Sequence, residues 1–353
     1  MNRTYSIVWS AVRNMYVVAS ELARGHSKVK IQAHANNEVA LSIEKPESGW
    51  IISAKHNALA FAIVAALGFA SPLAMADNPV SYIDGVDHDL NAETSPISYS
   101  GTGQGTALYL EGLATAKGGW QPTSGTGTGV VIETDGGGDL LPDGSYAIAT
   151  AIKLASGAVL NLTNAEISTT GNYSTGIELT GQSSITLTGG TLQVKGNYGI
   201  MTLSGESQAT LSDIKVTATA ETTSNISVGE GSTLKIKDGS EVTLTNGQLS
   251  VAGNTTSNAF LYVANSTVSS TGTKSTVIAS NQGILDIKNS TITHDNVAGA
   301  AIEAVNASTV TISGDNKNSM VITSEDIGIK SAKSSVNIDG ATIIAKGDGI
   351  LMT

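Results

Sequence analysis

From residue 158 onward, apolar and polar residues alternate in short runs that recur about every 25 residues, a period typical of repeat folds. Each run holds two apolar residues separated by one residue, and a turn former follows two positions later. Alternation with a period of two predicts short β-strands that bury one face. The second apolar residues of the successive runs are Leu162, Leu187, Leu211, Ile236, Val263, Ile287, Ile312 and Ile338.

The turn-forming position is Asn, Asp or Gly in all eight repeats. These residue types tolerate positive φ or hydrogen-bond their own turn. The column therefore predicts a corner at which the chain leaves one strand in every repeat. Its members are Asn164, Gly189, Asp213, Asp238, Asn265, Asn289, Gly314 and Gly340.

Two further apolar columns complete the repeat. An apolar residue returns three positions after the corner in six repeats, whereas Glu241 is displaced by one position from Val242 and Lys317 interrupts the column. Strands that short cannot bury an apolar face alone, but stacked copies can. We therefore predict an all-β fold, a right-handed parallel β-helix with about eight turns in residues 158–353. A third strand per turn is expected near Ile177, Ile200, Ile226, Leu249, Val277, Ile302, Ile329 and Ile350.

Residues 77–157 follow this repeat poorly. Gly-Thr runs occupy residues 101–105 and 125–129, and glycines flanked by Asp135 and Asp139 precede Pro142. A solenoid has to cover its open edge. The segment is therefore predicted to form irregular first coils or an N-terminal cap.

Residues 1–76 have a different composition from the rest of the chain. They hold seven basic and four acidic side chains, whereas residues 77–353 hold twelve Lys, no Arg and 26 acidic side chains. An uncharged stretch at residues 58–70, ALAFAIVAALGFA, follows Lys55 and His56. Thirteen apolar residues span about 20 Å as a helix, less than the ~30 Å of a hydrocarbon core. The stretch is therefore a signal core and not a membrane anchor.

A signal peptidase site follows the apolar core. Ala74 and Ala76 form an A-x-A pattern, the third part of a secretory signal after the basic region and the apolar core. We expect cleavage before Asp77, which makes residues 1–76 an extended Sec signal peptide.

The segment ahead of the apolar core is too long for an ordinary signal peptide. Its start, MNRTYSIVWSAVRNMYVVASELARG, resembles the extended signal region of autotransporters and of their two-partner and trimeric relatives in Gram-negative bacteria. By spacing alone, residues 4–24 also fit an amphipathic helix. The residues that carry the resemblance are Met1-Asn2-Arg3, Tyr5, Ile7 to Trp9, Val17-Val18 and Ser20 to Gly25.

The resemblance implies export by the Sec machinery and signal peptidase, followed by passage through an outer-membrane barrel. Such a barrel shows alternating strands with aromatic girdles, and residues 77–353 contain one Trp, one Phe and seven Tyr. We therefore expect a passenger fragment truncated before its translocator. It would reside in the periplasm, or at the cell surface if the full-length protein has a translocator. A two-partner-secretion exoprotein is the alternative, although its usual NPNL- and NPNGI-like motifs do not occur.

The amino-acid composition limits the classes of partner that this chain is expected to bind. A net charge of -11 excludes a nucleic-acid partner, because phosphate binding requires clustered Lys and Arg. The absence of Cys suits a chain that must thread a barrel without cross-links, and a Ser/Thr-rich repeat with no use for Cys explains it equally well. Long Ser/Thr/Asn-rich faces favour non-enzymatic adhesion or self-association, with a host surface or sibling cells as partners.

Candidate catalytic chemistry is sparse. Residues 77–353 contain only two His, and Gly205 to Ala209 lacks the second Gly of a nucleophile elbow. A polysaccharide-degrading β-helix enzyme, the second alternative, needs carboxylates that converge on one groove. The acidic residues lie in different columns, so we predict no enzyme and no cofactor. The candidate carboxylates are Glu166, Glu178, Asp213 and Asp286.

Two acidic clusters contain candidate metal ligands. Asp84, Asp87, His88 and Asp89 offer hard ligands for Ca²⁺ at short spacing. The run lacks the order of an EF-hand loop, so a solvated loop is the preferred interpretation. Asp135, Asp139 and Asp143 do not match calcium-binding repeats and are interpreted as turn formers, and no metal site is predicted.

Overall fold

A computed structural model describes residues 5–10, 15–20, 29–34, 38–43, 50–54 and 77–353, apart from residues 116–117, 197, 220–224 and 317. The chain divides into two compact units, Met1–Ala74 and Met75–Thr353. Among the described residues, none belongs to a helix that combines the length and hydrophobicity required to cross a bilayer.

The first unit contains antiparallel strands. β1 (Tyr5–Ser10) pairs with β2 (Met15–Ser20), and β3 (Val29–His34), β4 (Glu38–Ile43) and β5 (Trp50–Ala54) form a three-stranded sheet. The amphipathic helix that spacing allowed for residues 4–24 is therefore wrong. The strand sequences YSIVWS and MYVVAS are rich in β-branched and aromatic residues, which favour strands over helices.

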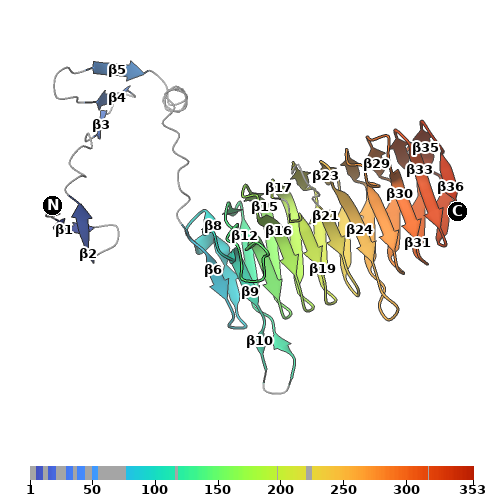
Figure 1. Ribbon diagram of the computed structural model, residues 1–353, viewed down its shortest axis with the longest axis horizontal. Helices are drawn as coiled ribbons and strands as arrows, with labels where there is room; N and C mark the ends of the chain where they lie inside the picture. Colours follow the sequence, from blue (N-terminus) through green and yellow to red (C-terminus); the bar gives the residue numbers. More distant parts are fainter. Residues whose placement is uncertain are drawn as a thin grey trace. The chain divides into compact units, whose positions relative to one another are not determined.

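The second unit is a parallel β-solenoid, as predicted, and its coils follow one another from β6 to β36 (Figure 1). An eleven-stranded parallel sheet contributes one strand to each coil, so the solenoid has about eleven turns. This sheet contains β6 (Val80–Tyr82), β9 (Gly105–Glu111), β14 (Ala149–Ala155), β16 (Ser174–Leu179), β18 (Met201–Leu203), β21 (Asn225–Val228), β24 (Gln248–Ala252), β27 (Val277–Ser280), β30 (Ala300–Val305), β33 (Ile327–Ala332) and β36 (Ile350–Met352).

A second, eighteen-stranded sheet supplies the other two strands of each coil, one on each side of the corner. The strands before the corner are β7 (Asp87–Asp89), β12 (Ser124–Thr128), β15 (Val159–Thr169), β17 (Ser184–Val194), β19 (Gln208–Ser212), β22 (Thr233–Lys237), β25 (Phe260–Ala264), β28 (Ile284–Lys288), β31 (Thr309–Ser313) and β34 (Ser335–Asp339). In β15 and β17 the strand continues through the corner. The strands after it are β8 (Ile97–Tyr99), β13 (Val131–Thr134), β20 (Lys215–Ala218), β23 (Glu241–Leu244), β26 (Thr267–Ser270), β29 (Thr291–His294), β32 (Val321–Ser324) and β35 (Thr342–Ala345).

The apolar columns of the sequence are the core of the solenoid. The second apolar residues of the runs, from Leu162 to Ile338, pair in register from each coil to the next. Those from Leu162 to Ile312 are at most 2% exposed. Parallel in-register pairing stacks identical positions of neighbouring coils on one another. The predicted inward alternation is therefore confirmed.

Two columns need correction where corners or loops differ in length. Val242, the apolar residue next to Glu241, pairs with Val216 and Val268, and Ile322 pairs with Ile292 and Ile343, so both continue the apolar column that follows the corner. One extra residue at the corner before Val242 and a longer loop before β32 change the spacing in the sequence. The register between neighbouring coils is unchanged. In the eleven-stranded sheet, Met201 and not Ile200 pairs with Ile177 and Ile226.

Residues 77–157 add coils to the same stack, with longer connections. Val80 pairs with Leu108, and Leu108 pairs with Ile152, so the second of these coils is much longer than a regular one. This long coil contains a hairpin of β10 (Leu113–Ala114) and β11 (Trp120–Gln121), which projects from the stack in Figure 1. It also contains a loop closed by a bridge between Leu140 and Tyr146.

The poor pattern of these coils has a packing cause. Gly125 and Gly127 pair with the inward residues Leu160 and Leu162, so glycines occupy core positions. A Cβ at Gly125 would lie 3.2–3.3 Å from three leucine side chains, one of which is Leu90. Leu90 comes from the 3₁₀ helix η2 (Leu90–Ala92) and is 2% exposed. It fills the space that the glycines leave open.

Candidate functional site

The backbone has a positive φ at seven of the eight residues of the corner column. Gly314, the eighth member, is not among the residues with positive φ. Asn289 Nδ2 donates to Asp315 Oδ2 of the next coil at 2.7 Å, and Ser212 Oγ donates to Asp238 Oδ2 at 2.9 Å. The corners therefore join coils through side-chain hydrogen bonds as well. The seven members with φ between 48 and 70° are Asn164, Gly189, Asp213, Asp238, Asn265, Asn289 and Gly340.

The predicted cleavage site falls largely outside the described residues, because Ala74 and Ala76 are not among them. Asp77 is described, and its Oδ1 accepts hydrogen bonds from the amide and the hydroxyl of Ser100 at 2.6 and 2.8 Å. Asp77 is therefore tied to the first coils. Cleavage before it stays a prediction.

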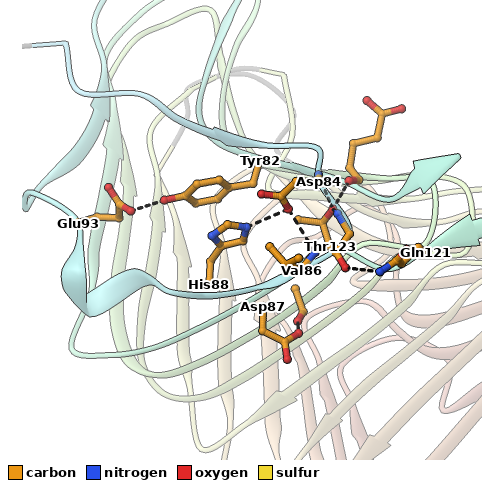
Figure 2. Close-up of polar contacts among 11 residues, drawn as sticks. Tyr82, Asp84, Val86, Asp87, His88, Glu93, Gln121 and Thr123 are labelled. Carbon is orange, nitrogen blue, oxygen red and sulfur yellow. Dashed lines mark hydrogen bonds and ion pairs between the residues drawn. The ribbon is translucent and has the colours of Figure 1, made fainter.

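The first coils carry a polar cluster around His88 (Figure 2). The His88 ring lies nearly parallel to the ring of Tyr82, with centroids 3.5 Å apart. His88 Nε2 is 3.0 Å from Asp84 Oδ1, and the Tyr82 hydroxyl donates to Glu93. The cluster thus holds an imidazole between a carboxylate and an aromatic face.

The hydrogen bonds of this cluster shift two pKa values. The bond from His88 lowers the pKa of Asp84 below its ordinary value. The bond to Glu93 raises the pKa of Tyr82 to about 12, and burial and the negative charges of Glu93 and Asp84 act in the same direction. The ionised carboxylates therefore favour a neutral phenol at Tyr82.

Two of the four candidate Ca²⁺ ligands, Asp84 and His88, contact each other, and the other two have separate partners. Asp87 accepts a hydrogen bond from Ser124, while Asp89 accepts from the amide of Asn91 at 3.0 Å and caps η2. Across the described residues, no three His, Cys, Asp or Glu side chains gather where they could hold a metal ion. The structure does not bring these four together as a ligand set.

The later acidic cluster forms loop contacts. Asp143 Oδ1 accepts from the amide and the hydroxyl of Ser145 at 3.0 and 2.7 Å, and these bonds lower its pKa. Asp139 Oδ2 accepts from Thr102 Oγ1 at 3.0 Å. The bonds of Asp143 fit its interpretation as a turn former, whereas the bond of Asp139 joins two segments that are 37 residues apart in the sequence.

The candidate catalytic carboxylates lie in separate places. Glu178 lies on the eleven-stranded sheet, where Lys153 Nζ is 3.1 Å from both of its oxygens. Glu166 pairs with Val131 and Thr191, whereas Asp286 pairs with Tyr262 and Thr311. Asp213 is a corner residue. The register thus places the four in four different columns.

One row of outward residues follows the solenoid axis on the eighteen-stranded sheet. Over seven successive coils the row holds six hydroxyl side chains and one amide, none of them buried, and Glu133 and Ile344 continue the row at its two ends. Ser269 Oγ lies 3.5 Å from Thr243 Oγ1 in the neighbouring coil. We call this row the hydroxyl ladder: Ser168, Gln193, Thr217, Thr243, Ser269, Thr293 and Thr323.

A stack of three tyrosines was missed by sequence reasoning. Tyr146, Tyr173 and Tyr198 come from successive coils, and their ring centroids are 4.4 and 5.8 Å apart. Loss of solvent contact and the neighbouring phenol of Tyr146 raise the pKa of Tyr173. Their spacing along the chain matches the period of the repeat. Searching the polar positions for that period would have found them.

The comparisons with known proteins concern the N-terminal segment. Residues 1–42 match the family model described as Extended Signal Peptide of Type V secretion system. The comparisons with curated proteins and with solved structures gave no match. The matched segment supports Sec-dependent export across the inner membrane. The chain therefore joins an extended signal peptide of type V secretion to a parallel β-solenoid, a combination that fits an autotransporter.

Proposed function

We propose that residues 77–353 act as a non-enzymatic adhesive passenger, which binds a host surface or sibling cells after export. The observation that carries this proposal is the hydroxyl ladder. Its side chains present donors and acceptors along the axis of a rigid stack, and each hydroxyl can serve as either. A row of this kind can make many weak contacts with a partner along the length of the solenoid.

Two further observations support a binding role. The candidate catalytic carboxylates lie in separate columns, so none is placed to share one substrate bond with another. Residues 77–353 carry twelve Lys and 26 acidic residues, which disfavours polyanionic partners.

Surface display tests the proposal. The full chain, fused at its C-terminus to the translocator of a characterised autotransporter, is produced in a non-adherent Gram-negative strain. We expect faster settling of the culture or increased adherence to cultured epithelial cells, relative to cells that display the translocator alone. Surface protease treatment verifies that the passenger is exposed. Exposed passenger without either effect would contradict the proposal.

A matched pair of double variants locates the activity. Thr217 and Thr243 are register partners in the hydroxyl ladder, and Thr186 and Thr210 are outward register partners on the strands before the corner. Changing the first pair to Lys should reduce settling or adherence, whereas changing the second pair to Lys should not. Equal effects would remove the ladder as the basis of adhesion. Release of reducing ends from polysaccharides by the purified protein would contradict its non-enzymatic character.

A further inference from the structure

The tyrosine stack lies at the surface, where burial of apolar area does not account for it. Tyr146 and Tyr198 are 42% and 44% exposed. Each of the three rings precedes a strand of the eleven-stranded sheet by a few residues, namely β14, β16 and β18. The stack therefore borders the outer face of this sheet.

An insertion in the long second coil builds the stack. Tyr146 closes the inserted loop through its bridge with Leu140, and this places its ring beside that of Tyr173. Gly138, with φ of +111°, lies against Tyr173, and a Cβ there would be 3.1 Å from the ring. The loop backbone thus leaves room for the aromatic ring.

A groove of about 360 Å³ lies beside Tyr198, across β9, β14, β16 and β18. Its lining includes the Lys153–Glu178 ion pair, whose side chains are 36% and 32% exposed. Hydroxyl groups supply most of the remaining polar lining, from Thr106, Thr150, Thr175, Thr202 and Ser204. The groove therefore combines one exposed aromatic ring with hydroxyls and a pair of opposite charges.

This combination matches the chemistry of a sugar. The C–H groups on one side of a pyranose ring pack against the electron-rich face of an aromatic ring. Its hydroxyls pair with side-chain hydroxyls, and the charged groups give stronger hydrogen bonds than neutral ones. We propose that this groove binds a neutral oligosaccharide, with Tyr198 as the stacking platform and Lys153 and Glu178 as hydrogen-bonding partners. The proposal rests on the adhesive role above and names a ligand class for it, at a second surface on the other sheet from the hydroxyl ladder.

Charge selects among ligands that stack on aromatic rings. Nucleic acids also stack on tyrosine, but they require a positively charged groove. Here the single Lys is neutralised by Glu178, and residues 77–353 are strongly acidic. Sialylated and sulfated glycans meet the same repulsion. A neutral glycan remains.

The extent of the groove favours a chain over a single sugar. Its lining comes from strands of four successive coils. Three strand spacings of about 4.8 Å give a length of roughly 14 Å. That length accommodates more than one sugar unit, so the side-chain hydroxyls of each coil can form hydrogen bonds with the ligand.

Binding is measured on the exported product purified from cells that express the full chain. It is applied to an array of neutral, sialylated and sulfated oligosaccharides, and the best neutral one is titrated by calorimetry. Tyr198→Ala should weaken affinity by at least about tenfold, as expected for truncation of an anchoring aromatic residue. Thr202→Arg fills the groove at an exposed position and should have a similar effect. Trp120→Ala, at a site 48% exposed, is the matched control and should leave affinity unchanged.

Several outcomes would overturn the assignment. They are binding restricted to sialylated or sulfated glycans, no glycan binding at all, or equal affinity in wild type, Tyr198→Ala and Thr202→Arg. Loss of affinity only in Trp120→Ala would move the site to the groove that Trp120 lines with Gln182 and Glu206.

Displayed cells separate this proposal from the adhesive function. If the soluble neutral oligosaccharide inhibits adherence of wild-type cells, and Tyr198→Ala cells adhere poorly, both proposals are supported. Adherence that persists in Tyr198→Ala and resists the oligosaccharide overturns the groove assignment alone. Glycan binding by the purified protein without any adherence supports the groove and contradicts the adhesive function.

Discussion

Leu187 and Leu211 are one repeat apart in the sequence and pair directly in neighbouring coils, where both side chains are at most 1% exposed. Their outward neighbours Thr186 and Thr210 form the adjacent register pair and are only partly buried. The two pairs differ in the face of the strand that they occupy. Substitutions at these four positions therefore compare core and surface at nearly identical places in the fold.

Leu187→Asp or Leu211→Asp should lower the free energy of unfolding by several kcal/mol, because the new carboxylate has no partner in the core. Thr186→Asp or Thr210→Asp should change it by about 0.5 kcal/mol or less. Circular dichroism and denaturant midpoints of the exported protein measure both. Equal losses at inward and outward positions would be incompatible with the stack.

Asn265 tests the corner column, because its φ is 49°. Asn265→Ala should lower the free energy of unfolding by about 1–2 kcal/mol, since a Cβ without a locally bonding polar group disfavours this conformation. Asn265→Gly should be tolerated, because glycine adopts positive φ without steric cost. Chemical denaturation distinguishes the two. A stable Ala variant would show that the corner imposes no conformational demand at this position.

His294 is fully buried at the end of β29. Its Nε2 lies 2.9 Å from the carbonyl oxygen of Ala298, and its Nδ1 lies 3.1 Å from Thr276 Oγ1. His294→Leu should cost about 1–3 kcal/mol, because both hydrogen bonds of the buried imidazole are lost. The outward neighbour Thr293 provides the control as Thr293→Ala. Comparable denaturation midpoints for the two variants would argue against a structural role for the imidazole.

Stability should fall in alkaline solution because of two tyrosines. Tyr109 has a pKa raised to about 12 by burial and by its hydrogen bond to Glu111, and Tyr82 has the same value through Glu93. Both folded values lie above the ordinary value of 10.0. The stabilising contribution is therefore complete below pH 10 and is lost as the pH rises through 12.

Denaturation curves between pH 9 and 12 measure this loss, and ultraviolet difference spectra report tyrosinate formation. The double variant Tyr82→Phe/Tyr109→Phe should show a weaker dependence on pH in this window. Some dependence should persist, because the pKa values of Tyr99 and Tyr173 are also raised. An unchanged slope in the double variant would assign the effect to other groups.

The regular coils could be predicted from the sequence because every inward position has to be apolar and every corner restricts the backbone. The first coils could not, because Gly125 and Gly127 occupy inward positions and Leu90 fills their space from the preceding coil. Periodicity detects residues that repeat locally. It does not detect a side chain supplied from elsewhere.

The same contrast holds for the candidate site. Lys153 and Glu178 meet because their spacing in the sequence equals one turn, so a search for opposite charges at that period would have found them. The position of Tyr146 depends on the inserted loop and its bridge to Leu140. Its spacing from Tyr173 follows the repeat, but the sequence does not show that the inserted loop brings the two rings together.

Each strand of the eleven-stranded sheet pairs only with the strands of the coil before and the coil after. In one coil, for example the coil that contains β19 and β20, the strand edges that face the next coil thus resemble those that the preceding coil presents to it. Duplication or loss of one complete repeat would join compatible surfaces and lengthen or shorten the rod by one step. Outside the four coils that line the Tyr198 groove, genetic change in this protein can therefore add or remove whole coils and alter the length of the solenoid without altering that groove.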